Sequence, residues 1–120
     1  MPDSPRIRDD PSPADVAATP DPVVRCAACS RELARLADRI ANEPDELHTF
    51  VNPQGEVFEL VRFSRADGAS AFGRPSHQFT WYPGYAWRYA GCRGCGAQLG
   101  WRFEGPSTFW GLVRGALLWP

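Results

Sequence analysis

The chain of 120 residues contains no lysine, and all 13 of its basic residues are arginine. The absence of lysine excludes catalysis through a lysine Schiff base or a lysine general base. The formal net charge is −1, so there is no excess of positive charge to neutralise phosphates. A nucleic-acid partner is therefore not expected.

Long apolar segments are also missing. No apolar run reaches the roughly 20 residues that a membrane-spanning helix needs. The first twenty residues lack the apolar stretch of a secretory signal. We therefore expect no membrane partner and a cytoplasmic location, where thiols stay reduced and favour metal binding over disulfides.

Large apolar side chains are scarce in residues 1–22, which hold six of the twelve prolines and five aspartates. Such a segment cannot bury enough surface to offset the entropy of ordering it, so we predict a disordered tail. Residues 23–120 then form one domain. A domain of about 100 residues buries a modest share of its surface, and a structural metal is an expected source of extra stability.

The pattern along the domain predicts a mainly β fold of antiparallel strands. Alternation and turn residues predict strands at 23–25, near 47–51, and at 56–63, 77–82, 85–90 and 97–104. Residues 52–55 have the preferences of a type I turn, and Pro83-Gly84 those of a type II turn. Residues 64–76 are predicted to be a loop. Two segments stay ambiguous: 30–41 is a helix or a pair of short strands, and 109–119 a strand or a docked helical turn.

All four cysteines lie in two Cys-x-x-Cys motifs, formed by Cys26 with Cys29 and by Cys92 with Cys95. A two-residue spacer lets both sulfurs of a motif face one ion, and two such motifs supply four thiolate ligands for Zn²⁺. Four sulfur ligands leave no open coordination position, so this zinc would be structural. A redox pair or two disulfides are the alternatives, and the doubled motif favours the metal.

Aromatic residues are concentrated around the second motif. Period-two alternation predicts three groups of side chains that each share a face: Leu99, Trp101 and Phe103; Phe79 and Trp81; and Tyr85, Trp87 and Tyr89. These faces can converge on a cage that holds a cation or a flat neutral ring. Aromatic residues of small β domains also commonly form the core, and spacing alone leaves both interpretations open. Alternation points Glu104 away from the face of Phe103, which disfavours a cation.

Five motifs follow one another along the chain: Val51-Asn52-Pro53-x-Gly55, Thr80-Trp81-Tyr82-Pro83-Gly84-Tyr85-Ala86-Trp87, Cys92-x-x-Cys95, Leu99-Gly100-Trp101-Arg102-Phe103 and Phe109-Trp110-Gly111-Leu112. In this order they resemble the thalidomide-binding (CULT) domain family of cereblon, above all its single-domain bacterial homologues. The resemblance covers about residues 23–118. It departs at Phe79, where cereblon carries histidine.

The resemblance implies a β-tent, in which two antiparallel sheets meet at an angle and are joined by the Cys₄ zinc site. It also implies a pocket for cyclic imides, such as the glutarimide ring of thalidomide-type drugs, for uracil-like rings, or for C-terminal cyclic imides of proteins. The ligand-binding residues would be Asn52 at the rim, Phe79 and Trp81 through their backbone groups, and the side chains of Trp81, Trp87, Trp101 and Phe103.

Two other functions fit parts of the sequence. An interaction module could use the same aromatic cage for modified peptide side chains or cations. Methionine sulfoxide reductases share the β-tent and a doubled Cys-x-x-Cys zinc site, but they need a further nucleophilic cysteine. All four cysteines here belong to the zinc motifs, so we expect a non-enzymatic binding domain. The physiological ligand and the oligomeric state do not follow from these motifs.

Overall fold

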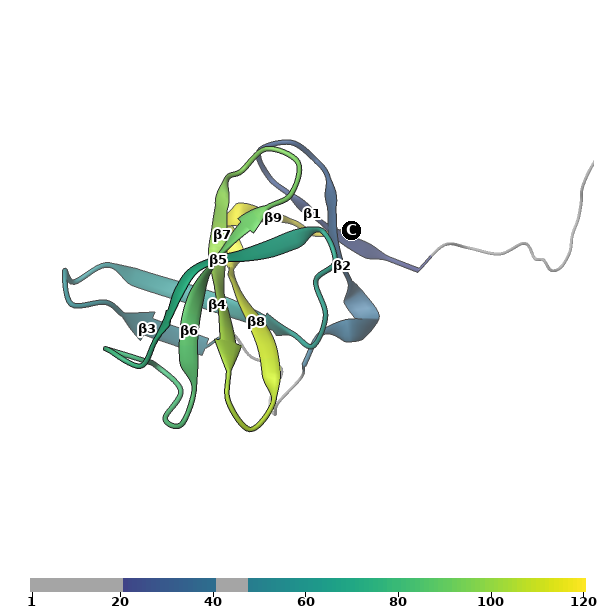
Figure 1. Ribbon diagram of the computed structural model, residues 1–120. Coiled ribbons are helices and arrows are strands. Elements are labelled where there is room, and N and C mark those ends of the chain that lie inside the picture. The colour runs from purple at the N-terminus through teal and green to yellow at the C-terminus, as the bar shows by residue number, and fades with distance from the viewer. Residues whose placement is uncertain (1–20, 41–47) are drawn as a thin grey trace, which may run out of the picture.

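The computed structural model describes residues 21–40 and 48–120, which form two antiparallel β-sheets (Figure 1). The prediction of a mainly β domain is confirmed. The predicted disordered tail falls almost entirely on residues 1–20, outside the described residues. In the described ranges, no helix has the length and apolar character needed to cross a lipid bilayer.

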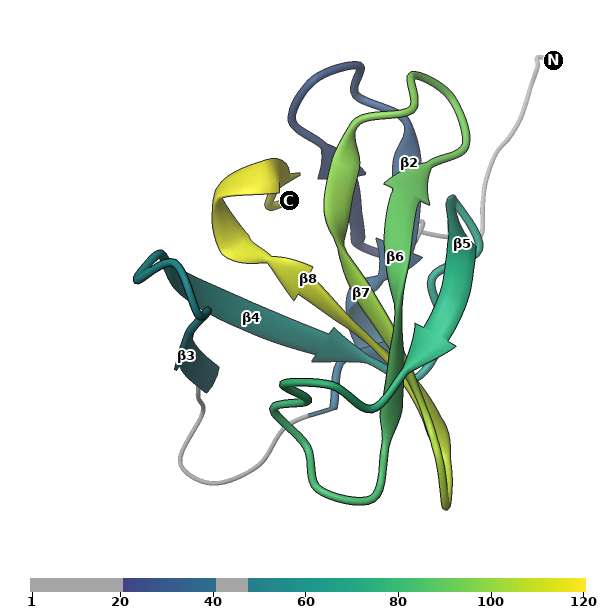
Figure 2. The same cartoon turned by 60° about the vertical axis from the view of Figure 1, so that its left-hand side comes forward.

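The larger sheet has six strands, and every neighbouring pair is antiparallel. In spatial order the strands are β3 (His48–Val51), β4 (Val57–Phe63), β8 (Thr108–Val113), β7 (Gln98–Glu104), β6 (Ala86–Cys92) and β5 (Ala69–Ser76). The β3–β4 hairpin projects to one side of the molecule (Figures 1 and 2). This hairpin and the connection between β5 and β6 supply much of the lining of the aromatic pocket.

Both turns that the sequence predicted are present. In the β3–β4 turn, Gly55 has a φ of +87° and its N–H donates to the carbonyl of Asn52 at 2.9 Å. In the second turn, the N–H of Tyr85 donates to the carbonyl of Tyr82 at 3.0 Å, and Gly84 has a φ of +87°. Glycine adopts this left-handed backbone without the steric cost of a Cβ atom, which explains its place in both turns.

The smaller sheet has three strands, in the order β2 (Glu32–Arg35), β1 (Val23–Cys26) and β9 (Leu117–Leu118). Within the described part of the segment 30–41, residues 30–40 contain one strand, followed by a single 3₁₀ turn, η1 (Leu36–Asp38). Pairing with β1 buries Leu33 and Ala34, which decides this segment in favour of a strand. The C-terminal segment combines both expected forms, because a 3₁₀ turn, η2 (Arg114–Ala116), links β8 to β9.

A hydrophobic cluster lies on each face of the larger sheet, because consecutive strand residues point to opposite faces. In β4, Val61 packs into the cluster shared with the smaller sheet, whereas Leu60 packs into the cluster on the other face. In β8, Leu112 and Phe109 are divided in the same way. The first cluster joins the two sheets, and the second underlies an aromatic pocket.

Two segments differ from the sequence prediction. Residues 69–76, expected as part of a loop, form the edge strand β5. Gly73 and Pro75 were the loop signals, but an edge strand tolerates both, and the ladder with β6 is irregular there. Residues 77–82, expected as a strand, form an irregular connection in which Phe79 has a φ of +57°. A strand does not accommodate that backbone angle.

One extra residue in β7 changes which face its side chains occupy. Ala90 pairs with Gly100, while the next residue of β6 pairs with Gln98, so Leu99 is bulged out of the ladder. Leu99 therefore packs between the two sheets. The prediction that it shares a face with Trp101 is wrong, because alternation was counted through the bulge.

This bulge makes Gly100 hard to replace. Its φ is +150°, and an added Cβ would lie 2.3 Å from the backbone oxygen of Gly111 in β8. We expect Gly100→Ala to lower the free energy of unfolding by about 2–4 kcal/mol, since backbone strain and the clash both oppose it. Chemical denaturation followed by tryptophan fluorescence measures the loss.

Gly115→Ala is the matched control, because an added Cβ there meets no atom within 4 Å. It should change the unfolding free energy by less than about 0.5 kcal/mol. Equal losses in the two variants would contradict the role assigned to the bulge.

Candidate functional site

The four cysteines come together where the two sheets meet. Cys26 and Cys29 belong to the β1–β2 turn of the smaller sheet, and Cys92 and Cys95 to the β6–β7 turn of the larger one. These two turns lie side by side at one end of the molecule (Figure 2). All four sulfur atoms lie within 4.8 Å of one another. The cluster therefore links the sheets across segments far apart in sequence.

The two turns repeat the same hydrogen bonds. The N–H of Ser30 donates to the carbonyl of Cys26 at 2.7 Å, and the N–H of Gly96 donates to that of Cys92 at 2.9 Å. Both Ser30 and Gly96 are left-handed, with φ of +67° and +79°. In the second turn, the N–H of Gly94 also points at the sulfur of Cys92 at 3.3 Å. The backbone thus directs both sulfurs of each turn inward.

The sulfur spacing matches a tetrahedral ion. With Zn–S bonds of about 2.3 Å, tetrahedral sulfurs lie about 3.8 Å apart. The sulfurs of Cys26 and Cys95 are 3.8 Å apart and those of Cys29 and Cys92 3.6 Å apart. A disulfide needs about 2.05 Å, so the cysteines are free thiols. This ligand set could hold a metal ion.

The thiols alone share little negative charge. Burial raises the pKa of the Cys92 thiol, but backbone N–H groups and the neighbouring thiols outweigh burial and lower its pKa to about 7. At Cys29 the N–H of Arg31 lowers the pKa, but desolvation and the other three thiols raise it to about 11. Formation of one thiolate in the cluster thus makes formation of a second thiolate less favourable. A divalent cation supplies the charge that four thiolates require.

A pocket of about 570 Å³ lies on the face of the larger sheet that carries the second hydrophobic cluster. Its lining includes all six residues that the sequence singled out for ligand binding: Asn52, Phe79, Trp81, Trp87, Trp101 and Phe103. None of the four cysteines lines it. The metal-type cluster and the aromatic pocket are therefore separate sites.

Strand register supplies the floor of the pocket. Trp101 and Phe103 of β7 lie directly opposite Tyr89 and Trp87 of β6. Opposed residues of antiparallel strands share a face, so these four rings are neighbours. Phe103 is only 1% exposed, which places it at the base.

Trp81 reaches the pocket from the β5–β6 connection. It stacks on Phe50 of β3, with ring centroids 4.9 Å apart and planes 5° from parallel. It meets Trp101 edge-on, at 4.9 Å and 79°. Phe58 of β4 also meets Trp101 edge-on, at 5.2 Å and 81°. The indoles of Trp81 and Trp101 are thus held nearly at right angles, as adjacent walls.

The third indole fastens the connection from the other side. Nε1 of Trp87 donates a hydrogen bond to the backbone carbonyl of Gln78 at 2.7 Å. The next residue, Phe79, is left-handed and its side chain is 66% exposed at the pocket mouth. An aromatic side chain at this position is costly for both backbone and solvation, which makes the connection a candidate for ligand contact.

The backbone beside these rings has free polar groups. Within the described residues, the N–H and C=O groups of Phe79 and Trp81 make no hydrogen bond, although neighbouring groups of Gln78, Thr80 and Tyr82 are engaged. Both residues line the pocket. Unpaired donors and acceptors therefore lie beside three indoles, where a ligand can complete their hydrogen bonding.

Tyr82 supports the walls from behind. Its ring meets Phe103 edge-on at 4.8 Å, and its hydroxyl lies 2.8 Å from Nδ1 of His48. Burial raises the pKa of Tyr82 to about 12, although the charge of Arg62 lowers it. The hydroxyl therefore stays protonated at neutral pH and can donate to the imidazole. Tyr82 is thus a structural partner of His48.

Sequence reasoning missed six further residues that line the pocket: Pro53, Gln54, Glu56, Phe58, Tyr89 and Gln98. Tyr89 shares the predicted face of Trp87, so alternation already contained its signal. Phe58 lies on a predicted strand, but the face that it occupies depends on the pairing of β4 with β8. Glu56 follows the β3–β4 turn, and no periodic pattern indicates the direction of its carboxylate.

Comparison with known proteins finds no matching protein-family model. Cereblon from Danio rerio is 44% identical over 75 residues, which cover 58% of this chain and 17% of that protein. Cereblon from Xenopus tropicalis is 45% identical over 74 residues, covering 57% and 17%. Cereblon from Drosophila melanogaster is 34% identical over 99 residues, covering 73% and 17%. The chain thus spans about a sixth of these relatives, and its closeness to bacterial homologues stays a prediction.

The equivalence of the two cysteine turns gives a reciprocal test. Ser30 occupies a left-handed position that Gly96 occupies in the other turn. A left-handed residue with a Cβ costs roughly 1–2 kcal/mol. We expect Ser30→Gly to raise the free energy of unfolding by about 0.5–1 kcal/mol and Gly96→Ala to lower it by about 1 kcal/mol. Denaturation of the metal-loaded protein measures both, and a destabilised Ser30→Gly variant would contradict the equivalence.

Proposed function

Because the chain belongs to the cereblon family over the segment that it shares with these proteins, we propose that it is a non-enzymatic domain that binds cyclic imides. Its ligands are glutarimide rings, including those of thalidomide-type drugs, uracil-like rings that share the same polar edge, and C-terminal cyclic imides of proteins. The binding residues are Asn52, Phe79, Trp81, Trp87, Trp101 and Phe103. Nucleic acids and membranes are not among the proposed partners.

The free backbone groups of Phe79 and Trp81 carry this proposal. A cyclic imide presents a carbonyl, an N–H and a second carbonyl along one edge. Backbone N–H donors and carbonyl acceptors are complementary to that edge, and in the described residues these groups have no other partner. The faces of the ring are apolar and flat, which suits walls made of indoles.

The affinity that we expect for such a neutral ring is modest. Glutarimide has about eight non-hydrogen atoms, and about −0.8 kcal/mol for each gives about −6 kcal/mol, or tens of micromolar. The pocket opens at the surface beside the exposed Phe79, so a ring at the end of a protein chain could enter.

For the cysteine cluster we propose a structural Zn²⁺ ion bound by Cys26, Cys29, Cys92 and Cys95. Four thiolates complete a tetrahedral shell and leave no position for a substrate. The ion would fasten the β1–β2 turn to the β6–β7 turn and so hold the sheets together. Thiolate ligands of this kind favour a reducing compartment, and we propose the cytoplasm.

The composition of the pocket supports a binding role rather than catalysis. Its lining has no serine, cysteine or histidine in the described part of the chain, and its side chains are aromatic, amide, proline and one carboxylate. A methionine sulfoxide reductase would need a cysteine at its site. Here every cysteine lies in the metal-type cluster.

Binding can be tested by titrating glutarimide and following tryptophan fluorescence. We expect saturation at tens of micromolar, and we expect Trp101→Ala to weaken binding at least about thirtyfold, as removal of a central aromatic contact does. Trp110→Phe is the control, because Trp110 packs against the cluster between the sheets and does not line the pocket. Unchanged affinity in Trp101→Ala would refute the cage.

Zinc can be tested separately. We expect one zinc per chain by elemental analysis, and loss of the near-ultraviolet circular dichroism signal on strong chelation, because metal affinities of about 10–16 kcal/mol equal the stability of a whole domain. Cys26→Ser should lack zinc and fail to fold. A folded, metal-free Cys26→Ser protein would show that the cluster is dispensable.

A further inference from the structure

The pocket contains one charged side chain in the part of the chain that the structure describes, that of Glu56. The other lining residues are aromatic or neutral. Trp87, Trp101 and Tyr89 therefore surround a space that also faces a carboxylate. Aromatic faces and a carboxylate together attract a cation, through the ring quadrupole and through charge.

Asn52 holds this carboxylate in place. Its side-chain oxygen accepts hydrogen bonds from the N–H of Gln54 at 3.0 Å and from the N–H of Glu56 at 2.8 Å. Its side-chain nitrogen donates to Oε1 of Glu56, also at 2.8 Å. Most of the amide's hydrogen-bonding capacity is thus used within the turn. Besides its proposed place at the rim of the pocket, Asn52 therefore positions Glu56, whose second carboxylate oxygen remains available to a ligand.

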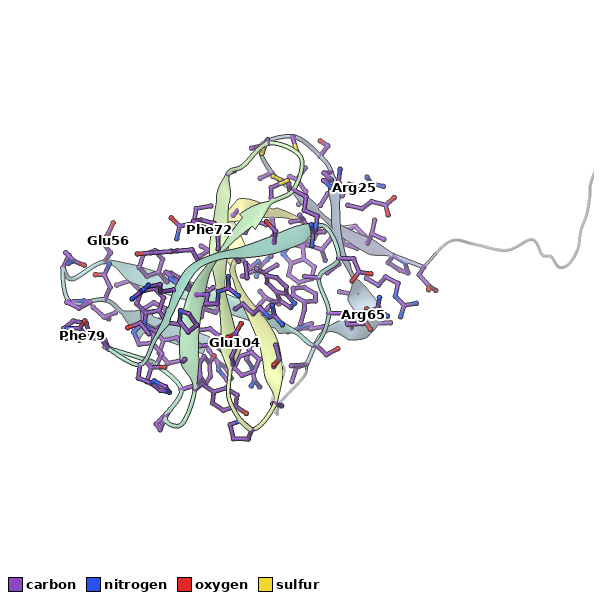
Figure 3. The ribbon with its side chains drawn as sticks, in the orientation of Figure 1. Arg25, Glu56, Arg65, Phe72, Phe79 and Glu104 are labelled. Atoms are coloured by element: carbon purple, nitrogen blue, oxygen red, sulfur yellow. The ribbon has the colours of Figure 1, made fainter. Side chains whose placement is uncertain are left out.

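Glu56 keeps its charge available. No ion pair within the described residues includes it, and its side chain is exposed. Glu104, in contrast, lies 3.6 Å from both Arg88 and Arg102 and does not line the pocket. Figure 3 shows Glu56 and Phe79 at the same end of the molecule, from the two connections that border the pocket.

The pocket is also larger than an imide ring. About eight non-hydrogen atoms, each given the ~30 Å³ that a water molecule occupies in the liquid, fill at most about 240 Å³. The pocket has about 570 Å³. More than half of it remains for a substituent of the ring, and Glu56 is among the residues that line the pocket.

We propose that Glu56 makes the pocket selective for cyclic imides whose ring substituent carries a positive charge. The inference rests on the proposed imide function and adds a substrate class to it. The imide edge binds the backbone of Phe79 and Trp81, and a cationic substituent lies between the aromatic side chains and the Glu56 carboxylate. An anionic substituent is repelled by the same carboxylate.

The expected effect is modest and sensitive to salt. Exposed charge pairs change binding by about two- to fivefold, and salt screens them. A cation–aromatic contact adds to the preference without depending on Glu56. The affinity of a neutral imide should not change with salt. Comparing charged and neutral imides therefore separates the contribution of charge from that of the imide ring.

A matched pair of ligands tests the proposal. One is the trimethylammonioacetyl amide of 3-aminoglutarimide, which carries a permanent charge. The other is its tert-butylacetyl analogue, in which carbon replaces the charged nitrogen at nearly equal shape. Unsubstituted glutarimide and tetramethylammonium chloride report the imide and the cation alone. Calorimetry at low and at high salt gives the affinities.

Three forms of the protein are compared: the full chain, Glu56→Gln and Glu59→Gln. Glu59→Gln removes the same charge three residues further along the chain, in β4, where Glu59 is exposed and does not line the pocket. We expect the full chain and Glu59→Gln to favour the cationic amide over its analogue about two- to fivefold at low salt. Glu56→Gln should reduce that ratio to the part that survives high salt, whereas Glu59→Gln should leave both the ratio and the glutarimide affinity unchanged.

Each other outcome has a distinct meaning. Equal affinities for the two amides in the full chain, or an undiminished ratio in Glu56→Gln, overturn the selectivity while glutarimide binding stands. Absence of binding by every imide overturns the proposed function and this inference with it. Binding of tetramethylammonium without binding of glutarimide shows a cation cage instead. Zinc content and circular dichroism confirm that the variants are folded.

Discussion

The arrangement of the pocket depends on the register between β6 and β7. The bulge at Leu99 and Gly100 adds one residue to β7, so that Leu99 packs between the sheets and Trp101 faces the pocket. Without that residue the ladder would send every side chain beyond it to the opposite face. The backbone of β8 lies so close to Gly100 that no side chain fits there. A single close contact between strands thus determines which aromatic rings line the pocket.

The turns and the cysteine motifs could be predicted from the sequence because they depend on residues close together in the chain. Features that depend on the pairing of distant strands could not be predicted in this way. Turns at Gly55 and Gly84 follow from the backbone freedom of glycine, and the cysteine motifs from ligand spacing. The edge strand β5 was missed because its pairing with β6, rather than its own pattern, stabilises it. Strand alternation over residues 77–82 also predicts that Trp81 faces the pocket. Trp81 does line the pocket, but from an irregular connection rather than a strand. The direction of Glu56 depends on one turn and had no periodic signal.

The two sites divide the work of the domain. The cysteine cluster lies where the β1–β2 turn of the smaller sheet contacts the β6–β7 turn of the larger sheet. A metal ion bound there would fix the position of one sheet relative to the other. The pocket lies on the opposite face of the larger sheet and uses a connection without regular structure. An irregular connection keeps polar backbone groups unpaired, which a strand inside a sheet would not. The cysteine cluster and the pocket are therefore built from different parts of the chain.

The main-chain groups of Phe79 and Trp81 have a consequence for how such a domain can diverge. Every residue brings the same amide and carbonyl, so exchanging a side chain does not erase a contact made by the main chain. Under the proposed imide binding, substitutions in the β3–β4 turn, such as those at Gln54 and Glu56, would change ligand preference while the main-chain contacts to the ring persist. Ligand specificity in such a domain would then change in small steps, and each step would keep the contacts that the main chain makes.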